Sequence, residues 1–282
     1  MAVRKVGLAL GGGVARGIAH VGVLQALAEA GVPIHCIAGT SAGSLVGALY
    51  AAGLDPWEME RLAGRLQWRG LVRLRLRRDG LLDAAGLERF ILGHVGDLTF
   101  EQLKVPFAAV ACDIRTGTRV VLREGRVAPA VRASCTFPGV FLPARMGPHL
   151  LVDGGLVSNV PVSACREMGA DYVIAVDLNR PSQNPRLPRN LVQILLYSLA
   201  VLQRPQIERC LQEADAVIQP DLGAFSVIEL ERVQEMVAEG RRAAEAAIPG
   251  ILAALRGAPP AVPVAPAAAA REPEVKTAET AG

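Results

Sequence analysis

A strand, a glycine cluster, a helix and a second strand follow one another at the start of the chain, and this order constrains the fold more than any other feature. Residues 4–10 are short and apolar, and the glycine-rich sequence "ALGGGVARG" overlaps their end. Residues 15–31 have the apolar spacing of a helix with a terminal glycine stop. Pro33 prevents continuation, and residues 34–38, "IHCIA", are typical of a buried strand. This βαβ unit predicts an α/β fold with a parallel sheet.

The rest of the chain predicts more elements of the same kind. Asp55 followed by Pro56 predicts the start of a helix, after a small-residue helix that runs from Ser41 to Gly53. Capping-box spacing recurs twice, and each instance predicts a helix start. These two boxes are Thr99 with Gln102 and Ser226 with Glu229. Strands are expected at 106–114 and 119–123 as a hairpin, at 150–153 and at 172–178, and long helices at 190–214 and 226–256.

Length and composition favour one domain with a tail. The chain has 282 residues, of which 51% are hydrophobic and 20% charged, which suits a globular protein with a sizeable core. From residue 257 the composition shifts to Pro and Ala, so we expect a folded domain over 1–256 and a disordered tail over 257–282. No apolar run approaches the length of a membrane span or a signal-peptide core, which predicts a cytoplasmic location.

Cysteine usage and net charge narrow the class of function. The five cysteines are odd in number and widely spaced, so we expect buried free thiols rather than disulfides or metal ligands. A net charge of +3 comes without any aromatic-plus-basic recognition motif. The sequence therefore indicates no metal site and no nucleic-acid partner, and it leaves the oligomeric state open.

One serine lies in a pattern that suits a nucleophile. Gly39-Thr40-Ser41-Ala42-Gly43 fits G-x-S-x-G and falls between a predicted strand and a predicted helix, the context of a nucleophile elbow. Gly39 and Gly43 would let the backbone turn sharply and expose the hydroxyl at a helix N-terminus. A glycine-lined turn that only packs helix on strand fits the motif equally well.

The histidines do not suit a triad, but one aspartate suits a dyad. A hydrolase of this type places its acid and then its histidine after the serine, whereas His149 precedes the best acid, Asp153. Asp153 ends an apolar strand and is followed by Gly154 and Gly155, which allow a close backbone approach. Burial would raise its pKa toward that of a general base. A turn aspartate without a catalytic role remains the alternative.

The glycine loop at residues 9–17 supplies backbone amides for an oxyanion. It follows the first strand and opens a helix, where free amides and the helix dipole favour negative charge. A dinucleotide fingerprint fails because Arg16 stands where the third glycine is needed. A P-loop fails because Ile18 and Ala19 replace the Lys-Ser/Thr pair.

The chain contains a glycine loop, a G-x-S-x-G motif and an Asp-Gly-Gly motif in this order. In this arrangement it resembles the patatin-like phospholipase family, especially small bacterial members similar to the catalytic domain of neuropathy target esterase. The family block Ala-Ser followed by proline is matched by Ser134 and Pro138, and the resemblance covers about residues 4–250. Val14 stands where many members have a third glycine, which leaves open which amides form the oxyanion hole. The resemblance implies Ser41 as nucleophile, Asp153 as base, an oxyanion hole of Gly11, Gly12, Gly13 and Arg16, and Gly39, Gly43, Gly154 and Gly155 as supporting residues.

The resemblance also implies a three-layer α/β fold and an activity. The expected enzyme is a serine esterase acting on phospholipids, lysophospholipids or related acyl esters without a metal or other cofactor. Arg16 would stabilise either the loop or the negative charge. Two alternatives stay open: an acyltransferase or acyl-protein esterase with the same dyad, and a non-catalytic regulatory or adaptor protein of the same fold.

Three further features have two interpretations each. Seven arginines and no acid lie between Arg61 and Arg78, which suits either a charged edge strand or a peripheral membrane contact aided by Trp57 and Trp68. The apolar stretch 190–202 would cover the pocket or form a dimer face. His20 would pack in the core or touch the site.

Overall fold

The computed structural model describes residues 4–68, 73–77, 80–181, 187–188 and 190–257. The expected tail at 257–282 lies outside the described residues except for Gly257, and so do parts of the Arg61–Arg78 segment. The membrane contact predicted for that segment therefore stays a prediction. In the described part of it, β3 (Arg73–Arg77) pairs antiparallel with β4 (Gly80–Asp83) as a separate two-stranded sheet.

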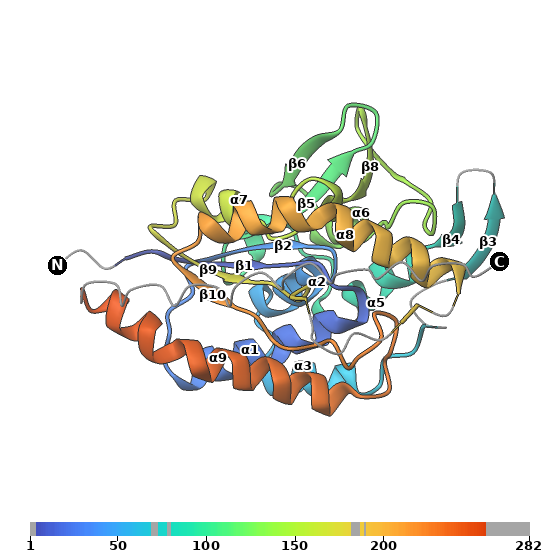
Figure 1. Ribbon diagram of the computed structural model, residues 1–282. Coiled ribbons are helices and arrows are strands. Elements are labelled where there is room, and N and C mark those ends of the chain that lie inside the picture. Colours follow the sequence, from blue (N-terminus) through green and yellow to red (C-terminus); the bar gives the residue numbers. More distant parts are fainter. Residues whose placement is uncertain (1–3, 69–72, 78–79, 182–186, 189, 258–282) are drawn as a thin grey trace, which may run out of the picture.

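An eight-stranded mixed sheet forms the centre of the fold, in the order β10-β9-β1-β2-β5-β8-β7 with β6 paired to β5 (Figure 1). The five strands from β10 to β5 are parallel to one another, whereas β6 and β8 run antiparallel to β5. The strands are β1 (Val6–Leu10), β2 (Cys36–Thr40), β5 (Phe107–Asp113), β6 (Thr118–Leu122), β7 (Ala144–Met146), β8 (His149–Asp153), β9 (Tyr172–Val176) and β10 (Ala216–Ile218).

Helices cover both faces of this sheet, which gives three layers (Figure 1). One face carries α1, α2, α3 and α9, and the other carries α7 and α8. The α-helices are α1 (Ala19–Glu29), α2 (Ala42–Ala51), α3 (Pro56–Ala63), α5 (Ala85–Val95), α6 (Val127–Ser134), α7 (Val162–Glu167), α8 (Leu191–Gln212) and α9 (Val233–Leu255). Short 3-10 helices are η1 (Val14–Ile18), η2 (Phe100–Gln102) and η3 (Gly154–Leu156). The predicted α/β class with a mostly parallel sheet is confirmed.

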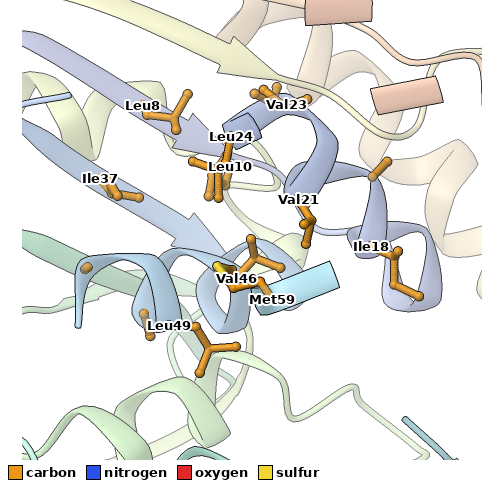
Figure 2. Packing of buried hydrophobic residues seen from close by; sticks show 14 of the residues in the cluster. Leu8, Leu10, Ile18, Val21, Val23, Leu24, Ile37, Val46, Leu49 and Met59 are labelled. Carbon is orange, nitrogen blue, oxygen red and sulfur yellow. The ribbon is translucent and has the colours of Figure 1, made fainter. Parts of the chain in front are cut away.

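The two-residue period of the strands distributes the core between the two faces. Leu8 and Leu10 of β1 pack with Leu24 of α1 and Val46 of α2 in the larger cluster (Figure 2). Ala9, on the opposite side of the same strand, belongs to the cluster beneath α7. Large side chains thus face the layer of α1 and α2, while small residues allow α7 to pack close to the sheet.

Several local predictions are confirmed, and one is wrong. Asp55 caps α3, because its Oδ1 accepts hydrogen bonds from the amides of Trp57 and Glu58 at 2.9 and 3.3 Å. The capping box at Thr99 and Gln102 forms, although it starts only the short helix η2. The helix expected from Ser226 begins instead at Val233.

The segment before α9 stays non-helical because its backbone is bonded to the glycine loop. Ser226 still donates its amide to the Glu229 carboxylate at 3.0 Å, so the local pattern forms a turn. Val227 offers its carbonyl to the amide of Ala15 at 3.0 Å, outside any helix ladder. Tertiary contact therefore outweighs the local capping signal.

None of the helices in the described ranges is both long and apolar enough to cross a bilayer. All five cysteines are free thiols, as expected, and Cys36, Cys112 and Cys165 are buried.

Candidate active site

Ser41 lies at the turn between β2 and α2 in a strained backbone conformation. Its φ is +53°, in the left-handed region that side chains other than glycine rarely adopt. The flanking glycines make the turn possible, because a Cβ at Gly39 would lie 2.4 Å from the Gly43 carbonyl oxygen and one at Gly43 would lie 2.1 Å from that of Leu10. The G-x-S-x-G pattern therefore forms the expected sharp strand-to-helix turn.

Two neighbouring serines fix the Ser41 backbone. The Ser41 amide donates to Ser134 Oγ at 2.9 Å, and Ser134 Oγ in turn donates to the Val110 carbonyl at 2.6 Å. Ser44 Oγ donates to the Ser41 carbonyl at 2.7 Å. Ser134 is fully buried, so the Ala-Ser block noted in the sequence holds the turn from α6.

Asp153 ends β8 beside Ser41 and has no cationic partner in the described structure. Its Oδ1 accepts a hydrogen bond from the Gly155 amide at 2.8 Å. Burial raises the pKa of Asp153 to about 6, while the nearby Ser41 side chain and the Gly155 amide oppose the rise. Gly154 is required here, because a Cβ would lie 2.3 Å from the Val110 carbonyl oxygen.

Ser41 and Asp153 both line one apolar pocket. It holds about 1040 Å³ of empty space, part of it open to solvent. Asp153 is the only carboxylate among its lining residues in the described part of the chain, and the rest are mostly aliphatic or aromatic. The lining includes Ile18, Leu45, Leu49, Met59, Phe90 and Phe137. Such a cavity suits an acyl chain whose carbonyl carbon stops at the serine.

The backbone amides of the glycine loop differ in whether they already donate a hydrogen bond to the protein. Gly11 donates its amide to the Val176 carbonyl at 3.0 Å, and Gly12 donates to that of Asn159 at 3.2 Å. Within the described residues, the amides of Gly13 and Val14 donate to no protein acceptor. The loop is close to the nucleophile, since a Cβ at Gly12 would lie 3.2 Å from Ser41 Cβ.

The backbone at Val14 has a conformation that glycine adopts more easily than valine. Its φ is +53°, and a β-branched residue in that region is strained. Val14 also lines the apolar pocket next to Ala15. This chain thus keeps the loop conformation at a conformational cost and adds a side chain to the cavity wall.

Arg16 connects the glycine loop to a distant segment. Its Nη2 and Nε donate to the Phe225 carbonyl at 2.8 and 3.2 Å. Burial lowers the pKa of Arg16, and the nearby Tyr197 of α8 opposes the shift. The guanidinium is therefore engaged by groups outside the pocket.

The two histidines nearest the predicted site have other partners. His20 is fully buried, and its Nε2 lies 2.8 Å from the Gly11 carbonyl oxygen, to which it donates. Burial lowers the pKa of His20 to about 4, so the ring is neutral. His149 Nδ1 lies 2.9 Å from Asp113 rather than beside Asp153. These two rings thus hydrogen-bond to Gly11 and Asp113.

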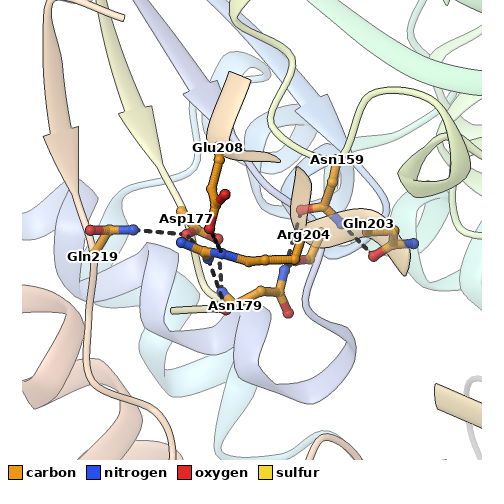
Figure 3. A network of polar contacts seen from close by, with 8 residues as sticks. Asn159, Asp177, Asn179, Gln203, Arg204, Glu208 and Gln219 are labelled. Atoms are coloured by element: carbon orange, nitrogen blue, oxygen red, sulfur yellow. Dashed lines mark hydrogen bonds and ion pairs between the residues drawn. The ribbon is translucent and has the colours of Figure 1, made fainter. Parts of the chain in front are cut away.

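A polar network that sequence reasoning missed supports the glycine loop (Figure 3). Asn179 Nδ2 donates to the Gly12 carbonyl at 2.8 Å and to Asn159 Oδ1 at 3.2 Å. Asp177 Oδ1 accepts from the Asn179 amide at 2.9 Å, and its Oδ2 accepts from Gln219 at 2.9 Å and from Arg204 at 3.3 Å. Asp177 and Asn179 follow directly on β9, and a polar pair at the carboxyl end of a parallel strand was the available signal.

Among the described residues, no group of three His, Cys, Asp or Glu side chains is placed to hold one metal ion.

Comparison with known protein families gives a match that covers all three sequence motifs of the site. The family model for patatin-like phospholipase matches residues 8–166, which include the glycine loop, the Ser41 turn and Asp153. This chain belongs to the patatin-like phospholipase family. The family indicates a hydrolase acting on lipid esters.

The relatives of this patatin-like protein include NTE family proteins. An uncharacterised NTE family protein of Mycobacterium tuberculosis is 34% identical over 280 residues, covering 88% of this chain and 47% of the relative. A lysophospholipase, nte1, of Aspergillus fumigatus is 37% identical over 187 residues, covering 64% of this chain and 12% of the relative. The chain thus spans about half the length of the mycobacterial relative.

Two solved structures share the fold. VipD from Legionella pneumophila has a TM-score of 0.58 at 14% identity, covering 90% of this chain and 67% of VipD. The type III effector protein ExoU has a TM-score of 0.51 at 15% identity, covering 88% of this chain and 53% of ExoU.

Proposed function

We propose that this protein is a serine acyl hydrolase that cleaves carboxylic esters of phospholipids or lysophospholipids. The observation that carries the proposal is the buried Asp153 carboxylate near the side chain of Ser41, a serine with a strained backbone, where both residues line one apolar pocket. The relationship to a fungal lysophospholipase supports the choice of substrate class.

The chemistry follows from this pair of residues. Asp153 takes the hydroxyl proton as Ser41 Oγ attacks the ester carbonyl carbon, and the carbonyl oxygen becomes an oxyanion. The tetrahedral intermediate collapses, the alcohol leaves with the proton from Asp153, and the acyl group stays on Ser41. Water then attacks the acyl-enzyme, gives its proton to Asp153 and releases the fatty acid, after which that proton returns to Ser41.

The amides of Gly13 and Val14 are the proposed oxyanion donors. The amides of Gly11 and Gly12 already donate to carbonyls, which leaves the next two of the loop free for substrate. Arg16 would act by stabilising the loop, because Phe225 and Tyr197 occupy its guanidinium. This assignment refines the role expected for the glycine loop.

Labelling with a fluorophosphonate probe tests the proposal. We expect wild type to label, Ser41→Ala to lose all labelling, and Asp153→Asn to label about a thousandfold more slowly, within the usual range for loss of a general base. Ser198→Ala, at an exposed serine of α8, is the control and keeps the wild-type rate.

The same variants distinguish the competing functions. A folded wild type that neither labels nor hydrolyses a short soluble ester contradicts the proposal and favours an adaptor protein. Labelling together with acyl transfer to an added alcohol, in preference to water, favours an acyltransferase.

A further inference from the structure

His20 is a fully buried histidine that the proposed mechanism does not use. It lies in the first turn of α1, and its Nε2 donates to the Gly11 carbonyl at 2.8 Å. Within the described residues, its Nδ1 is buried without a hydrogen-bond partner. Burial also keeps the ring neutral, because it lowers the pKa of His20 to about 4. In the described part of the chain, the ring therefore bonds only to the glycine loop.

Packing alone does not account for a histidine at this position. Transfer of an imidazole from water into a core costs free energy, and a nitrogen without a partner adds to that cost. A leucine would fill similar space without either penalty. The helix that carries the ring is tightly packed, because a Cβ at Gly240 of α9 would overlap the Ala19 carbonyl oxygen of α1. The bond from this rigid helix to Gly11 is what an apolar residue could not supply.

The bond to Gly11 fixes the first peptide plane of the loop. In a planar trans peptide, the carbonyl oxygen and the following amide hydrogen point in opposite directions. A donor that holds the Gly11 carbonyl therefore also aims the Gly12 amide, which donates to the Asn159 carbonyl at 3.2 Å. Three glycines in a row would otherwise allow this plane to rotate, since glycine adopts many backbone conformations.

The next two peptide planes of the loop are held in the same way. The Gly12 carbonyl accepts from Asn179 Nδ2 at 2.8 Å. The Gly13 carbonyl accepts from the Arg16 amide at 3.1 Å. The amides of these two planes belong to Gly13 and Val14, the proposed oxyanion donors. Each donor amide thus depends on a carbonyl held on its other side, and the ring on α1 holds the plane from which the series starts.

We propose that His20 is a positioning residue, which orients the oxyanion loop through the Gly11 carbonyl and takes no part in proton transfer. The inference rests on the proposed function, because it concerns how that site holds its oxyanion. The loop lies against the nucleophile, since a Cβ at Gly12 would lie 3.2 Å from Ser41 Cβ. A shift of the first peptide plane therefore moves the donor amides relative to the serine, and stabilisation of the transition state is sensitive to such shifts.

Two amide variants of the full chain separate positioning from packing. Glutamine carries its amide nitrogen the same number of bonds from Cα as Nε2 of histidine, so His20→Gln retains a donor for the Gly11 carbonyl. Asparagine carries its nitrogen at the place of Nδ1, so His20→Asn does not reach. With a soluble ester, we expect His20→Asn to lower kcat about tenfold with KM unchanged, because the oxyanion forms only in the transition state. His20→Gln should stay within about threefold of the wild-type kcat.

Two controls accompany these variants. His94→Asn makes the same substitution at an exposed histidine of α5, whose Nδ1 lies 2.7 Å from the Phe90 carbonyl oxygen, and it should keep the wild-type kcat. The pH midpoint of kcat/KM should stay near 6 in His20→Gln, because the proposed base is Asp153. A lost or shifted midpoint would show that His20 transfers protons, which overturns the positioning role.

Hydrogen exchange of the Gly12 amide measures the loop without catalysis. This amide should exchange at least about tenfold faster in His20→Asn than in wild type, and at nearly the wild-type rate in His20→Gln. Slow exchange of the β5 amides, in the centre of the sheet, reports that each variant is folded. If His20→Asn is unfolded, His20→Leu takes its place, since leucine also lacks the donor.

The outcomes separate this inference from the proposed function. A wild-type kcat in His20→Asn overturns the inference. An equal loss of kcat in both amide variants also overturns it, because it would show that the ring only packs. A folded wild type that hydrolyses no ester contradicts the proposed function, whereas exchange of the Gly12 amide still decides whether His20 holds the loop.

Discussion

Asp153 and Asp177 are the same residue type, each lies at or just after the carboxyl end of a strand of the large sheet, and both are at most 5% exposed. Asp177 accepts hydrogen bonds from Arg204, Gln219 and the Asn179 amide. Among the described residues, the Asp153 carboxylate accepts from the Gly155 amide, lies near the Ser41 side chain and is paired with no cation.

The difference shows how partners decide the role of a buried carboxylate. An acid bonded to a guanidinium is held in place, so it serves to position what else it contacts. For Asp177 that neighbour is Asn179, which holds the Gly12 carbonyl. An acid without a cation gains proton affinity on burial, so it can take a proton from a hydroxyl and return it.

Exchanging each carboxylate for an amide should change stability in opposite directions, and this is the largest effect expected. Asp177→Asn removes the buried one of the two acidic partners of Arg204, whose side chain is a quarter exposed and keeps Glu208, and should lower the free energy of unfolding by about 2 to 3 kcal/mol. Asp153→Asn should raise it by about 1 to 3 kcal/mol at pH 8, because the ionised carboxylate is disfavoured by burial. Urea denaturation of both variants measures the difference.

The stability gained by Asp153→Asn should depend on pH in a definite direction. The pKa of Asp153 is raised to about 6 in the folded chain, so the folded state binds more protons than the unfolded state between pH 4 and 6. Its unfavourable contribution therefore grows as pH rises through this window, and it is absent below the ordinary carboxyl pKa. The advantage of Asp153→Asn should disappear at pH 4. An equal advantage at both pH values, or a loss at pH 8, would contradict the comparison.

A smaller effect, on catalysis, is expected for Asn179, whose amide donates a hydrogen bond to Asp177. Asn179→Ala removes the donor to the Gly12 carbonyl, so the amides that follow are no longer held in place. We expect kcat for a soluble ester to fall about tenfold with little change in KM, because the oxyanion forms only in the transition state. Gln219→Ala is the control, since it contacts Asp177 at the other end of the network and should keep kcat. A rise in KM alone would contradict the positioning role.

The parts of the fold that depend on local pattern were predictable. The βαβ start, the β5–β6 hairpin and the Asp55 cap follow from spacing and turn residues, and the motif order pointed to the family. The start of α9 was not predictable, because the residues before it are bonded to the glycine loop through Val227. Sequence spacing contains no information about such a contact between segments about 200 residues apart.

In the candidate site, too, residues within local motifs were predictable, whereas residues that act through contacts between distant segments were not. Ser41 and Asp153 could be predicted as candidates because each is a polar residue in a motif that contains glycines. Asn179 was missed because it carries no motif, and its role depends on β9 lying beside β1 in the sheet. That Gly13 and Val14, rather than Gly11 and Gly12, have free amides depends on the carbonyls of Val176 and Asn159, which only the folded chain brings near.

The pH dependence of kcat/KM for a soluble short-chain ester tests the role of Asp153 most directly. Among the described residues that line the pocket, Asp153 is the one expected to change charge between pH 5 and 8, because burial raises the pKa of Cys135 far above this range. We predict a rise of about tenfold per pH unit below a midpoint near pH 6, and a plateau above it. A rate that stays level down to pH 4 would show that the base has an ordinary carboxyl pKa, which would contradict a buried, cation-free Asp153 as the partner of Ser41.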